Sequence, residues 1–336
     1  MKNREKLLEV KHLQACFPTQ RGEVKAINDV SFSIDKGEIV ALVGESGSGK
    51  SVTALSVIGL NTPSIKYEKN SDISFKGKNL ISMKKKQMKK IRGNEISMIF
   101  QDPLSSLNPL HPIGRQIAEP IQLHQGLSYI KSREKVIDLL KKVGIPEPEK
   151  RLKDYPHQLS GGMRQRIMIA MALACNPSLL IADEPTTALD VTIQAQILNV
   201  MRELQKDTGI SILLITHDLG VVAEMADRVL VMYGGEIVEE GDVFSIFQNP
   251  KHPYTEGLLS SVPKLRGASE NRLRTIPGTV PNPLELPKGC NFQTRCSYAT
   301  EQCSDLSPQL VSNEMNGKVA CWHPLEKVNK KVTNFV

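Results

Sequence analysis

A glycine-rich segment flanked by two apolar segments constrains this chain more than any other feature. Residues 44–51 read Gly-Glu-Ser-Gly-Ser-Gly-Lys-Ser and fit the pattern G-x-x-x-x-G-K-S. Residues 39–43 precede them as an apolar run typical of a buried parallel strand, and residues 51–58 are typical of a buried helix. Strand, loop and helix in this order predict a phosphate-binding loop, whose N–H groups and helix N-terminus surround an anion. Lys50 would reach the outer phosphates, and the Ser51 hydroxyl would contact Mg²⁺.

Size and charge narrow the class of protein. At 336 residues, the chain suits one large domain or two unequal ones. It has no apolar run near the roughly 20 residues of a membrane-spanning helix, and its start lacks the apolar core of a signal peptide, so we expect a cytosolic protein. The net charge of +7 is mild, and the densest basic cluster, residues 84–92, favours a solvated helix face over nucleic-acid or lipid contact.

Polar and charged side chains follow three further apolar runs. Gln101, the pair Asp183 and Glu184, and His217 each end or follow a run typical of a buried strand. The carboxyl ends of parallel strands meet at one edge of a sheet, where a phosphate loop also lies. We therefore expect Asp183 to hold Mg²⁺ through water and Glu184 to polarise an attacking water. At the same edge, a functional role for His217 is favoured over a structural one.

Two further units flank these strands. Residues 8–43 alternate apolar and polar side chains in part, which predicts a small β-rich unit. Residues 112–158 are helical in pattern, with apolar side chains at i, i+3, i+4 and i+7 from Val136. The chain then reaches Ser160-Gly161-Gly162, which opens a helix expected over residues 167–174 and makes a second anion-receptive N-terminus. Two such loops in one chain are hard to explain with a single nucleotide.

These motifs, in this order, resemble the ATP-binding subunits of ABC transporters over roughly residues 6–250. The Leu-Ser-Gly-Gly-Met-Arg-Gln run at residues 159–165 is the most diagnostic match, and Ala188-Leu189-Asp190 is a further one. The resemblance implies a head-to-tail dimer with two ATP molecules, each between one subunit's phosphate loop and the other's Ser-Gly-Gly loop. Such a dimer accounts for two anion sites in one chain. The implied activity is ATP hydrolysis with Mg²⁺.

The resemblance also assigns roles to individual residues. Phe17, which by position alone suits the core and stacking on a base equally well, would stack on adenine. Glu184 would be the catalytic carboxylate, His217 would contact the γ-phosphate, and Gln101 would reach Mg²⁺. Residues implied in nucleotide binding are Phe17, Gly44, Glu45, Ser46, Gly47, Ser48, Gly49, Lys50, Ser51 and Val52; those serving the partner's site are Ser160, Gly161, Gly162 and Gln165; those near Mg²⁺ are Ser51, Gln101 and Asp183. One departure is Val52, where many members of the family have threonine.

The tail resembles the C-terminal extension of oligopeptide/dipeptide-type importers, which nickel-transporting relatives share. The match rests on residues 252–281, which include His-Pro-Tyr-Thr and Ile-Pro-Gly-Thr-Val-Pro. Four of the six cysteines follow with the spacing C-x5-C-x6-C-x17-C, at Cys290, Cys296, Cys303 and Cys321. This grouping predicts a metal centre rather than disulfides, with a [4Fe–4S] cluster ranked first by the resemblance, Zn²⁺ second and unligated thiols third. Cys16 and Cys175 are expected to be buried small hydrophobes.

The predicted fold is an α/β phosphate-loop ABC ATPase with an antiparallel β subdomain, an inserted helical subdomain and a loop-rich C-terminal extension. Residues 1–250 would form the ATP-binding domain, with the helical subdomain at about residues 102–167. Residues 251–336 would form the extension with its four-cysteine metal site. Because the nucleotide motifs end before the extension begins, we expect ATP binding at Lys50 to be independent of the extension's metal site and to survive replacement of any one of the four cysteines by serine.

The predicted function is to power the import of dipeptides or oligopeptides, with nickel or another solute as the alternative cargo. The chain would lie peripherally on the cytoplasmic face of the cell membrane. Its partners would be a second, related ATPase subunit, two permease subunits and an extracellular solute-binding protein. A soluble ATPase acting on nucleic acid is disfavoured because only one motif set is present, and a regulatory sensor because Glu184 and His217 are both intact.

Overall fold

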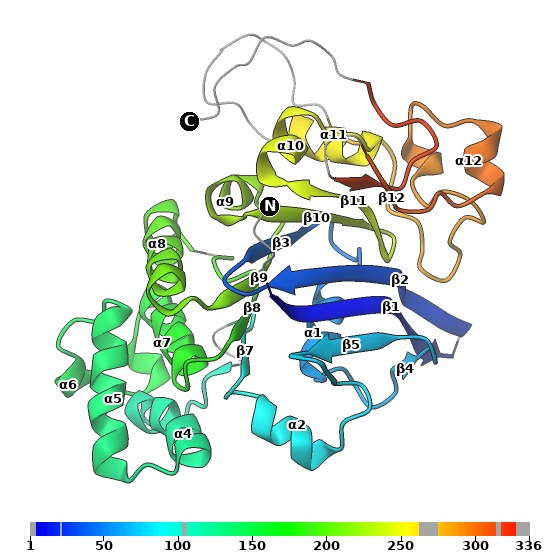
Figure 1. Cartoon of the computed structure of the whole chain (residues 1–336). Coiled ribbons are helices and arrows are strands. Elements are labelled where there is room, and N and C mark those ends of the chain that lie inside the picture. The colour runs from blue at the N-terminus through cyan, green and yellow to red at the C-terminus, as the bar shows by residue number, and fades with distance from the viewer. Residues whose placement is uncertain are drawn as a thin grey trace, which may run out of the picture.

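The computed structural model describes residues 5–20, 22–102, 106–187, 189–261, 275–313 and 317–326. Ala188 of the Ala-Leu-Asp match therefore lies outside the described residues. Two β-sheets form the centre of the structure (Figure 1). Helix α1 (Lys50–Ile58) packs in the core that they share and contacts strands of both sheets, and other helices lie around them. The expected combination of an α/β core, an antiparallel unit and inserted helices is confirmed.

The larger sheet has eight strands in the order β12-β13-β11-β10-β3-β9-β8-β7. The neighbours from β10 to β7 are parallel, and β11, β13 and β12 continue the sheet in antiparallel fashion. The parallel strands are apolar along most of their length because both faces of the sheet are covered. The strands are β3 (Ile39–Val43), β7 (Ile96–Ile99), β8 (Leu179–Asp183), β9 (Ser211–Ile215), β10 (Arg228–Tyr233), β11 (Glu236–Asp242), β12 (Val311–Ser312) and β13 (Lys318–Val319).

The smaller sheet is the antiparallel unit expected near the N-terminus. Its order is β2-β1-β5-β6, and β4 pairs with β1. Alternate side chains of its two long strands, such as Val10 and Phe32, are buried against the larger sheet in a shared core with Val40 and Leu42. The strands are β1 (Lys6–Thr19), β2 (Gly22–Asp35), β4 (Lys66–Tyr67), β5 (Asp72–Phe75) and β6 (Lys78–Asn79).

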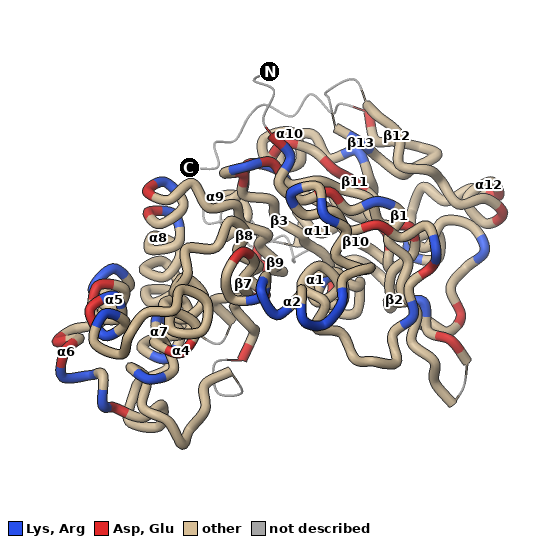
Figure 2. Tube along the Cα trace, turned by 60° about the horizontal axis from the view of Figure 1, so that its bottom comes forward, with Lys and Arg blue, Asp and Glu red and all other residues tan. Residues whose placement is uncertain are grey.

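The helices divide into those that cover the sheets and those of the insert. The α-helices are α1 (Lys50–Ile58), α2 (Lys85–Ile91), α4 (Ile113–Gln125), α5 (Tyr129–Lys142), α6 (Pro148–Arg151), α7 (Gly161–Leu173), α8 (Val191–Thr208), α9 (Leu219–Met225), α10 (Val243–Gln248), α11 (Pro253–Ser260) and α12 (Glu301–Asp305). Two short 3₁₀ helices are η1 (Pro156–Gln158) and η2 (Gln293–Arg295). In α2, Met88 and Ile91 are buried while the lysines are exposed, so the basic cluster forms a solvated helix face (Figure 2).

The helical insert packs as its apolar spacing predicts. Val136 and Leu140 of α5 are fully buried in one core with α4, α7 and the near face of the larger sheet. Helix α7 begins earlier than the expected residue 167, at Gly161, because Ser160 caps it: its hydroxyl accepts the N–H of Met163 at 3.3 Å. The insert lies to one side of the molecule, away from the smaller sheet (Figure 1).

The C-terminal extension packs on the larger sheet. Its strand β13 pairs with β11, and β12 pairs with β13, so the extension lengthens the central sheet. A third core joins Tyr254 and Phe292 of the extension to Val43 and Tyr233 of the sheet. Within the described part of the chain, no helix combines the length and the apolar character needed to cross a membrane.

Candidate nucleotide-binding site

The glycine-rich loop joins the carboxyl end of β3 to α1, at the edge of the sheet where β8 and β9 also end. Its lysine is buried, and the Nζ atom of Lys50 donates to the carbonyl oxygens of Gly44 at 2.8 Å and Glu45 at 2.9 Å. Burial lowers the pKa of Lys50, while the charges of Glu184, Asp183 and Glu45 oppose that shift. The ammonium group therefore folds back over the loop, where the outer oxygens of an anion would also lie.

Two glycines of the loop are required by close approaches of the backbone. A Cβ atom at Gly44 would lie 2.1 Å from the carbonyl oxygen of Met232, and one at Gly49 would lie 2.6 Å from that of Ala26. Both glycines have positive φ, +154° and +104°, in which L residues are strained. The loop thus fits tightly between the backbones of β10 and β2.

The loop presents unpaired donors. Among the described residues, the N–H groups of Gly47, Gly49, Lys50 and Ser51 have no protein acceptor, and the N-terminus of α1 has no side-chain cap. Unsatisfied N–H groups and the positive end of a helix dipole together form an anion-binding site. These residues therefore fit the phosphates of a nucleotide.

A carboxylate and a hydroxyl stand beside the loop at the end of β8. Ser51 Oγ donates to Asp183 Oδ1 at 3.2 Å, and Asp183 is buried. Burial raises the pKa of Asp183, and the hydrogen bond from Ser51 partly offsets this. Mg²⁺ is usually held in proteins by one or two carboxylates together with phosphate oxygens and water. The pair next to Lys50 fits that ligand set.

Glu184, at the end of β8, is held by side chains that follow two other strands, β7 and β9, and by one from its own following loop. Gln101 Nε2 and Thr187 Oγ1 donate to its Oε2 atom at 2.8 and 2.9 Å, and His217 Nδ1 lies 3.0 Å from Oε1. The backbone of Glu184 has φ +49°, an unfavourable conformation for a residue other than glycine. Strain of this kind clusters at functional sites. The structure thus brings Gln101, Glu184 and His217 together, whereas Thr187 was not singled out from the sequence.

The carboxyl group of Glu184 is kept ionised by its neighbours. Burial alone would raise its pKa, but hydrogen bonds and nearby charges outweigh burial and lower the pKa below its ordinary value. The contributing residues are His217, Thr187 and Lys50. A carboxylate in this state at neutral pH can orient a water molecule and accept its proton.

Other predicted site residues lie apart from this cluster. Phe17 is half-buried in β1, paired with Val24 of β2. Ser160 and Gly161 open α7, and in the described residues no hydrogen bond joins them to the phosphate loop. Gln165 is buried within α7, and its amide donates to the carbonyl oxygen of Pro185 in the loop after β8.

Four cysteines of the extension surround one cavity. Cys290, Cys296, Cys303 and Cys321 line it together with other residues that include Phe292. Burial raises the pKa of Cys290 and of Cys321 to about 11. Among the described residues, however, no group of three or more His, Cys, Asp or Glu side chains is arranged to hold a metal ion. The four thiols expected to form a metal centre thus line one cavity, but they are not arranged as the ligands of a bound ion.

The two remaining cysteines differ from each other. Cys175 is buried, as expected, and its Sγ atom donates to the carbonyl oxygen of Pro120 at 3.4 Å. Cys16 is only partly buried on β1. The expectation that Cys16 is fully buried is therefore wrong, because the last residues of β1, from Cys16 to Thr19, are partly buried or exposed.

Sequence reasoning also missed a contact between the extension and the phosphate loop. Arg295, which directly precedes Cys296 in the chain, forms an ion pair with Glu45 at 2.6 Å. The hydroxyl of Tyr254, from α11, accepts the N–H of Glu45 at 2.8 Å. No local pattern signals a contact between residues about 250 positions apart. The expectation that ATP binding is independent of the extension's metal site loses its basis, because the extension contacts the loop directly.

Comparison with known proteins agrees with this geometry. The family model described as ABC transporter matches residues 27–187, and the model of the oligopeptide/dipeptide transporter C-terminal region matches residues 238–303. The chain is 53% identical to the oligopeptide transport ATP-binding protein OppD of Bacillus subtilis, over 95% of this chain and 90% of that protein. It is 55% identical to the dipeptide transport ATP-binding protein DppD of Lactococcus lactis, over 88% and 84%, and 52% identical to a putative peptide import ATP-binding protein of Brucella ovis, over 94% and 96%.

Solved structures give the same result for the fold. The dimeric post-hydrolysis state of the ATP-binding cassette MJ0796, bound to ADP and Pi, superposes with a TM-score of 0.64 at 27% identity, covering 70% of this chain and 99% of that one. The cbiO1 protein of Clostridium perfringens, part of the ABC transporter complex cbiONQ, gives a TM-score of 0.62 at 28% identity, covering 73% and 92%. With its phosphate loop, its Glu184 cluster and a C-terminal extension in place, this chain belongs to the ABC transporter family of ATP-binding proteins, in the group with an oligopeptide/dipeptide transporter C-terminal region.

Proposed function

We infer that this chain is the ATP-hydrolysing subunit that powers peptide import through a membrane ABC transporter. The observation that carries the chemistry is Glu184, ionised and held between Gln101 and His217 beside the buried Lys50 and the Asp183–Ser51 pair. The peptide cargo is supported by relatives of about 50% identity that are described as oligopeptide, dipeptide or peptide import ATP-binding proteins.

Each residue of the cluster has a defined task in this proposal. Lys50 and the free N–H groups of the loop bind the phosphates of ATP, and Phe17 stacks on the adenine. Ser51, Gln101 and Asp183 hold Mg²⁺, which neutralises phosphate charge when bound. Glu184 orients the attacking water, and His217 holds the Glu184 carboxylate while facing the γ-phosphate.

The Ser-Gly-Gly segment is proposed to complete a second site across a dimer. Gly161 and Ser160 are exposed at the start of α7, where a phosphate of a partner's nucleotide could approach the helix N-terminus. Gln165 is buried against Pro185 in the loop after Glu184, so it would act on the partner site through this loop rather than by direct contact. A related second ATPase subunit, two membrane permeases and an extracellular solute-binding protein complete the proposed transporter, and this chain lies peripherally at the cytoplasmic face of the cell membrane.

Replacing Glu184 by glutamine tests the catalytic assignment. We expect MgATP to bind with near-normal affinity and turnover to fall about 10²–10⁴-fold, because the amide cannot accept the proton of water. The matched control is Glu203→Gln on α8, where the carboxylate contacts only Asn199 within its own helix among the described contacts. ATPase assays of the assembled transporter, with a partner's contribution excluded, provide the measurement. Near-normal turnover of Glu184→Gln would contradict the assignment.

We also propose that the four cysteines of the extension bind a [4Fe–4S] cluster, with Zn²⁺ as the alternative. A single ion requires its sulfur ligands about 2.3 Å from one point, an arrangement that the described residues lack. A cubane cluster instead takes each of four thiolates on a separate iron and so needs them around a larger space. The four cysteines line one cavity and would supply those four thiolates. Bound metal would cross-link a loop-rich segment with few regular elements.

Metal analysis separates these alternatives. Protein purified without oxygen from iron-replete cells should be brown and contain about four irons per chain, the content of a cubane. Replacing Cys290 or Cys321 by serine should remove the colour, whereas Cys175→Ser should not, because Cys175 does not line the cysteine cavity and instead hydrogen-bonds to Pro120 of the helical insert. One zinc per chain would favour the Zn²⁺ alternative over the cluster. Absence of metal from such preparations would contradict both the cluster and the Zn²⁺ proposal.

A further inference from the structure

We propose that the C-terminal extension holds the phosphate loop in its binding conformation through Glu45, with Arg295 and Tyr254 as positioning residues for ATP. The inference rests on the proposed nucleotide site, and it adds a function for the extension within that site. Among the contacts that the structure describes, both residues reach the phosphate loop at Glu45, and both act through it.

The first contact is a two-point ion pair. Arg295 Nη1 lies 2.6 Å from Glu45 Oε2, and Nη2 lies 3.1 Å from Oε1. The Arg295 side chain is only 4% exposed, whereas that of Glu45 is 29% exposed. Arg295 is itself fixed, because its Nε atom donates to the carbonyl oxygen of Pro277 at 2.9 Å. Paired hydrogen bonds between guanidinium and carboxylate are strong and set the orientation of both groups. The extension therefore fixes the Glu45 side chain.

The second contact fixes the Glu45 backbone from another part of the extension. The hydroxyl of Tyr254 accepts the Glu45 N–H at 2.8 Å. Tyr254 is fully buried, and its ring packs 4.6 Å from that of Tyr233 and 5.4 Å from that of Phe292, measured between centroids. A ring enclosed in this way cannot swing aside, so the position of its hydroxyl is set by the core.

Glu45 passes this restraint to Lys50. The carbonyl oxygen of Glu45 accepts one of the hydrogen bonds of the Lys50 ammonium group, at 2.9 Å. A shift of the Glu45 peptide group would therefore move the acceptor that aims Lys50. Glu45 also places a negative charge close enough to act on Lys50. Arg295 offsets this charge, which would otherwise oppose the approach of phosphates.

The main test is to measure the ATP affinity of the full chain carrying Arg295→Gln. Isothermal titration calorimetry with MgATP should give a Kd about tenfold higher than that of the unaltered chain. In the assembled transporter the KM for ATP should rise while kcat at saturating ATP changes little, because Glu184 and its partners are untouched. The matched control is Arg202→Gln, which removes a surface pair with Glu224 at 3.4 Å and should leave the Kd unchanged.

A double-mutant cycle tests whether Arg295 affects ATP binding through Glu45. If Arg295 acts through Glu45, Arg295→Gln should change the Kd less than about twofold when introduced into Glu45→Gln, because interacting residues are not additive. Equal losses in both backgrounds would overturn the link through Glu45.

A milder variant covers the case in which Arg295→Gln does not fold. Tyr254→Phe removes one hydroxyl and keeps the ring, and it should also weaken MgATP binding. Normal ATP affinity in Tyr254→Phe together with normal affinity in folded Arg295→Gln would overturn the inference. Failure of the unaltered chain to bind MgATP would instead contradict the proposed function.

Discussion

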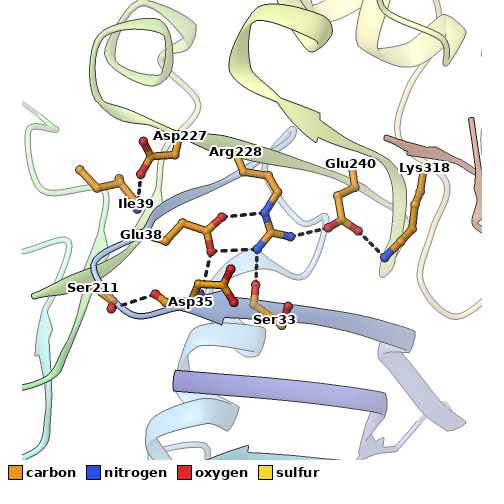
Figure 3. A network of polar contacts seen from close by, with 9 residues as sticks. All are labelled: Ser33, Asp35, Glu38, Ile39, Ser211, Asp227, Arg228, Glu240 and Lys318. Carbon is orange, nitrogen blue, oxygen red and sulfur yellow. Dashed lines mark hydrogen bonds and ion pairs between the residues drawn. The ribbon is translucent and has the colours of Figure 1, made fainter. Parts of the chain in front are cut away.

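Two arginines tie parts of the chain together at opposite ends of the same parallel strand. Arg295 reaches the loop that follows β3, whereas Arg228, at the start of β10, reaches Glu38 just before β3 (Figure 3). Arg228 Nε and Nη2 lie 2.8 and 3.1 Å from the carboxylate of Glu38, and Arg228 also pairs with Glu240. Glu240 in turn lies 3.0 Å from Lys318 of the extension. The extension thus contributes a charge at both ends of the sheet.

The two ends of β3 differ in which hydrogen-bond donors and acceptors they leave unpaired. At the Arg228 end, the acceptors and donors shown in Figure 3 satisfy one another; for example, Asp227 accepts the N–H of Ile39 at 2.9 Å, and Ser211 donates to the carbonyl oxygen of Asp35 at 3.1 Å. At the Arg295 end, four N–H groups of the loop have no acceptor in the described chain. Ligands of open α/β sheets bind at the carboxyl ends of the strands. The same ion-pair chemistry is therefore structural at one end and serves the binding site at the other.

The largest effect should come from Arg228→Gln. The Glu38 and Glu240 side chains are 8% and 9% exposed, so loss of the guanidinium leaves two buried carboxylates without their main partner. Breaking such a network costs about 3–5 kcal/mol of unfolding free energy. Urea unfolding should show this loss, while the Kd for MgATP of the folded variant stays normal. Weakened ATP binding without loss of stability would mean that the two ends do not differ in function.

A smaller effect is expected at Glu236, a carboxylate near the nucleotide end that pairs with no arginine among the described residues. Its neighbour Gly235 donates to the carbonyl oxygen of Ser48 in the phosphate loop at 3.0 Å. Burial raises the pKa of Glu236 from 4.5 to about 7, although Asn28 donates a hydrogen bond to it. Between these pH values the folded protein binds more protons than the unfolded chain, so stability falls as the pH rises through this window.

Glu236→Gln should remove this dependence. The amide stays neutral and can still accept the hydrogen bond from Asn28. We expect the variant to be more stable than the unaltered protein at pH 8, by an amount of order 1–2 kcal/mol, and the difference to shrink toward pH 4.5. Urea midpoints at pH 5 and pH 8 measure it. The same difference at both pH values would show that ionisation of Glu236 is not its cause.

The smallest effect should come from Lys318→Ala at the Arg228 end. The Lys318 side chain is 44% exposed, and exposed ion pairs contribute less than about 1 kcal/mol. Glu240 keeps Arg228 as its partner. Thermal unfolding should therefore change little, and a loss comparable to that in Arg228→Gln would show that attachment of the extension, rather than the buried arginine, stabilises this end.

Much of the site could be predicted because its parts are local patterns. Residues 39–43 form β3 with the predicted bounds, and α1 starts at Lys50 directly after the loop. Gln101, Asp183, Glu184 and His217 were placed together by one rule, that parallel strands present their carboxyl ends at one edge. Boundaries were less accurate: the helix expected over residues 167–174 begins at Gly161. Ends of elements depend on hydrogen bonds with other segments.

The sequence by itself determined the glycine-rich loop, the carboxylates at the end of β8 and the family, since each is encoded in short runs of residues with a fixed order. Only the tertiary structure decided what surrounds the loop. Glu45 reads as one more loop residue, and Arg295 as a neighbour of a cysteine, until packing of Phe292 and Tyr254 on Tyr233 brings the extension against β10. Contacts of this kind depend on burial of apolar surface between distant segments, which is non-directional and leaves no periodic signal in the chain.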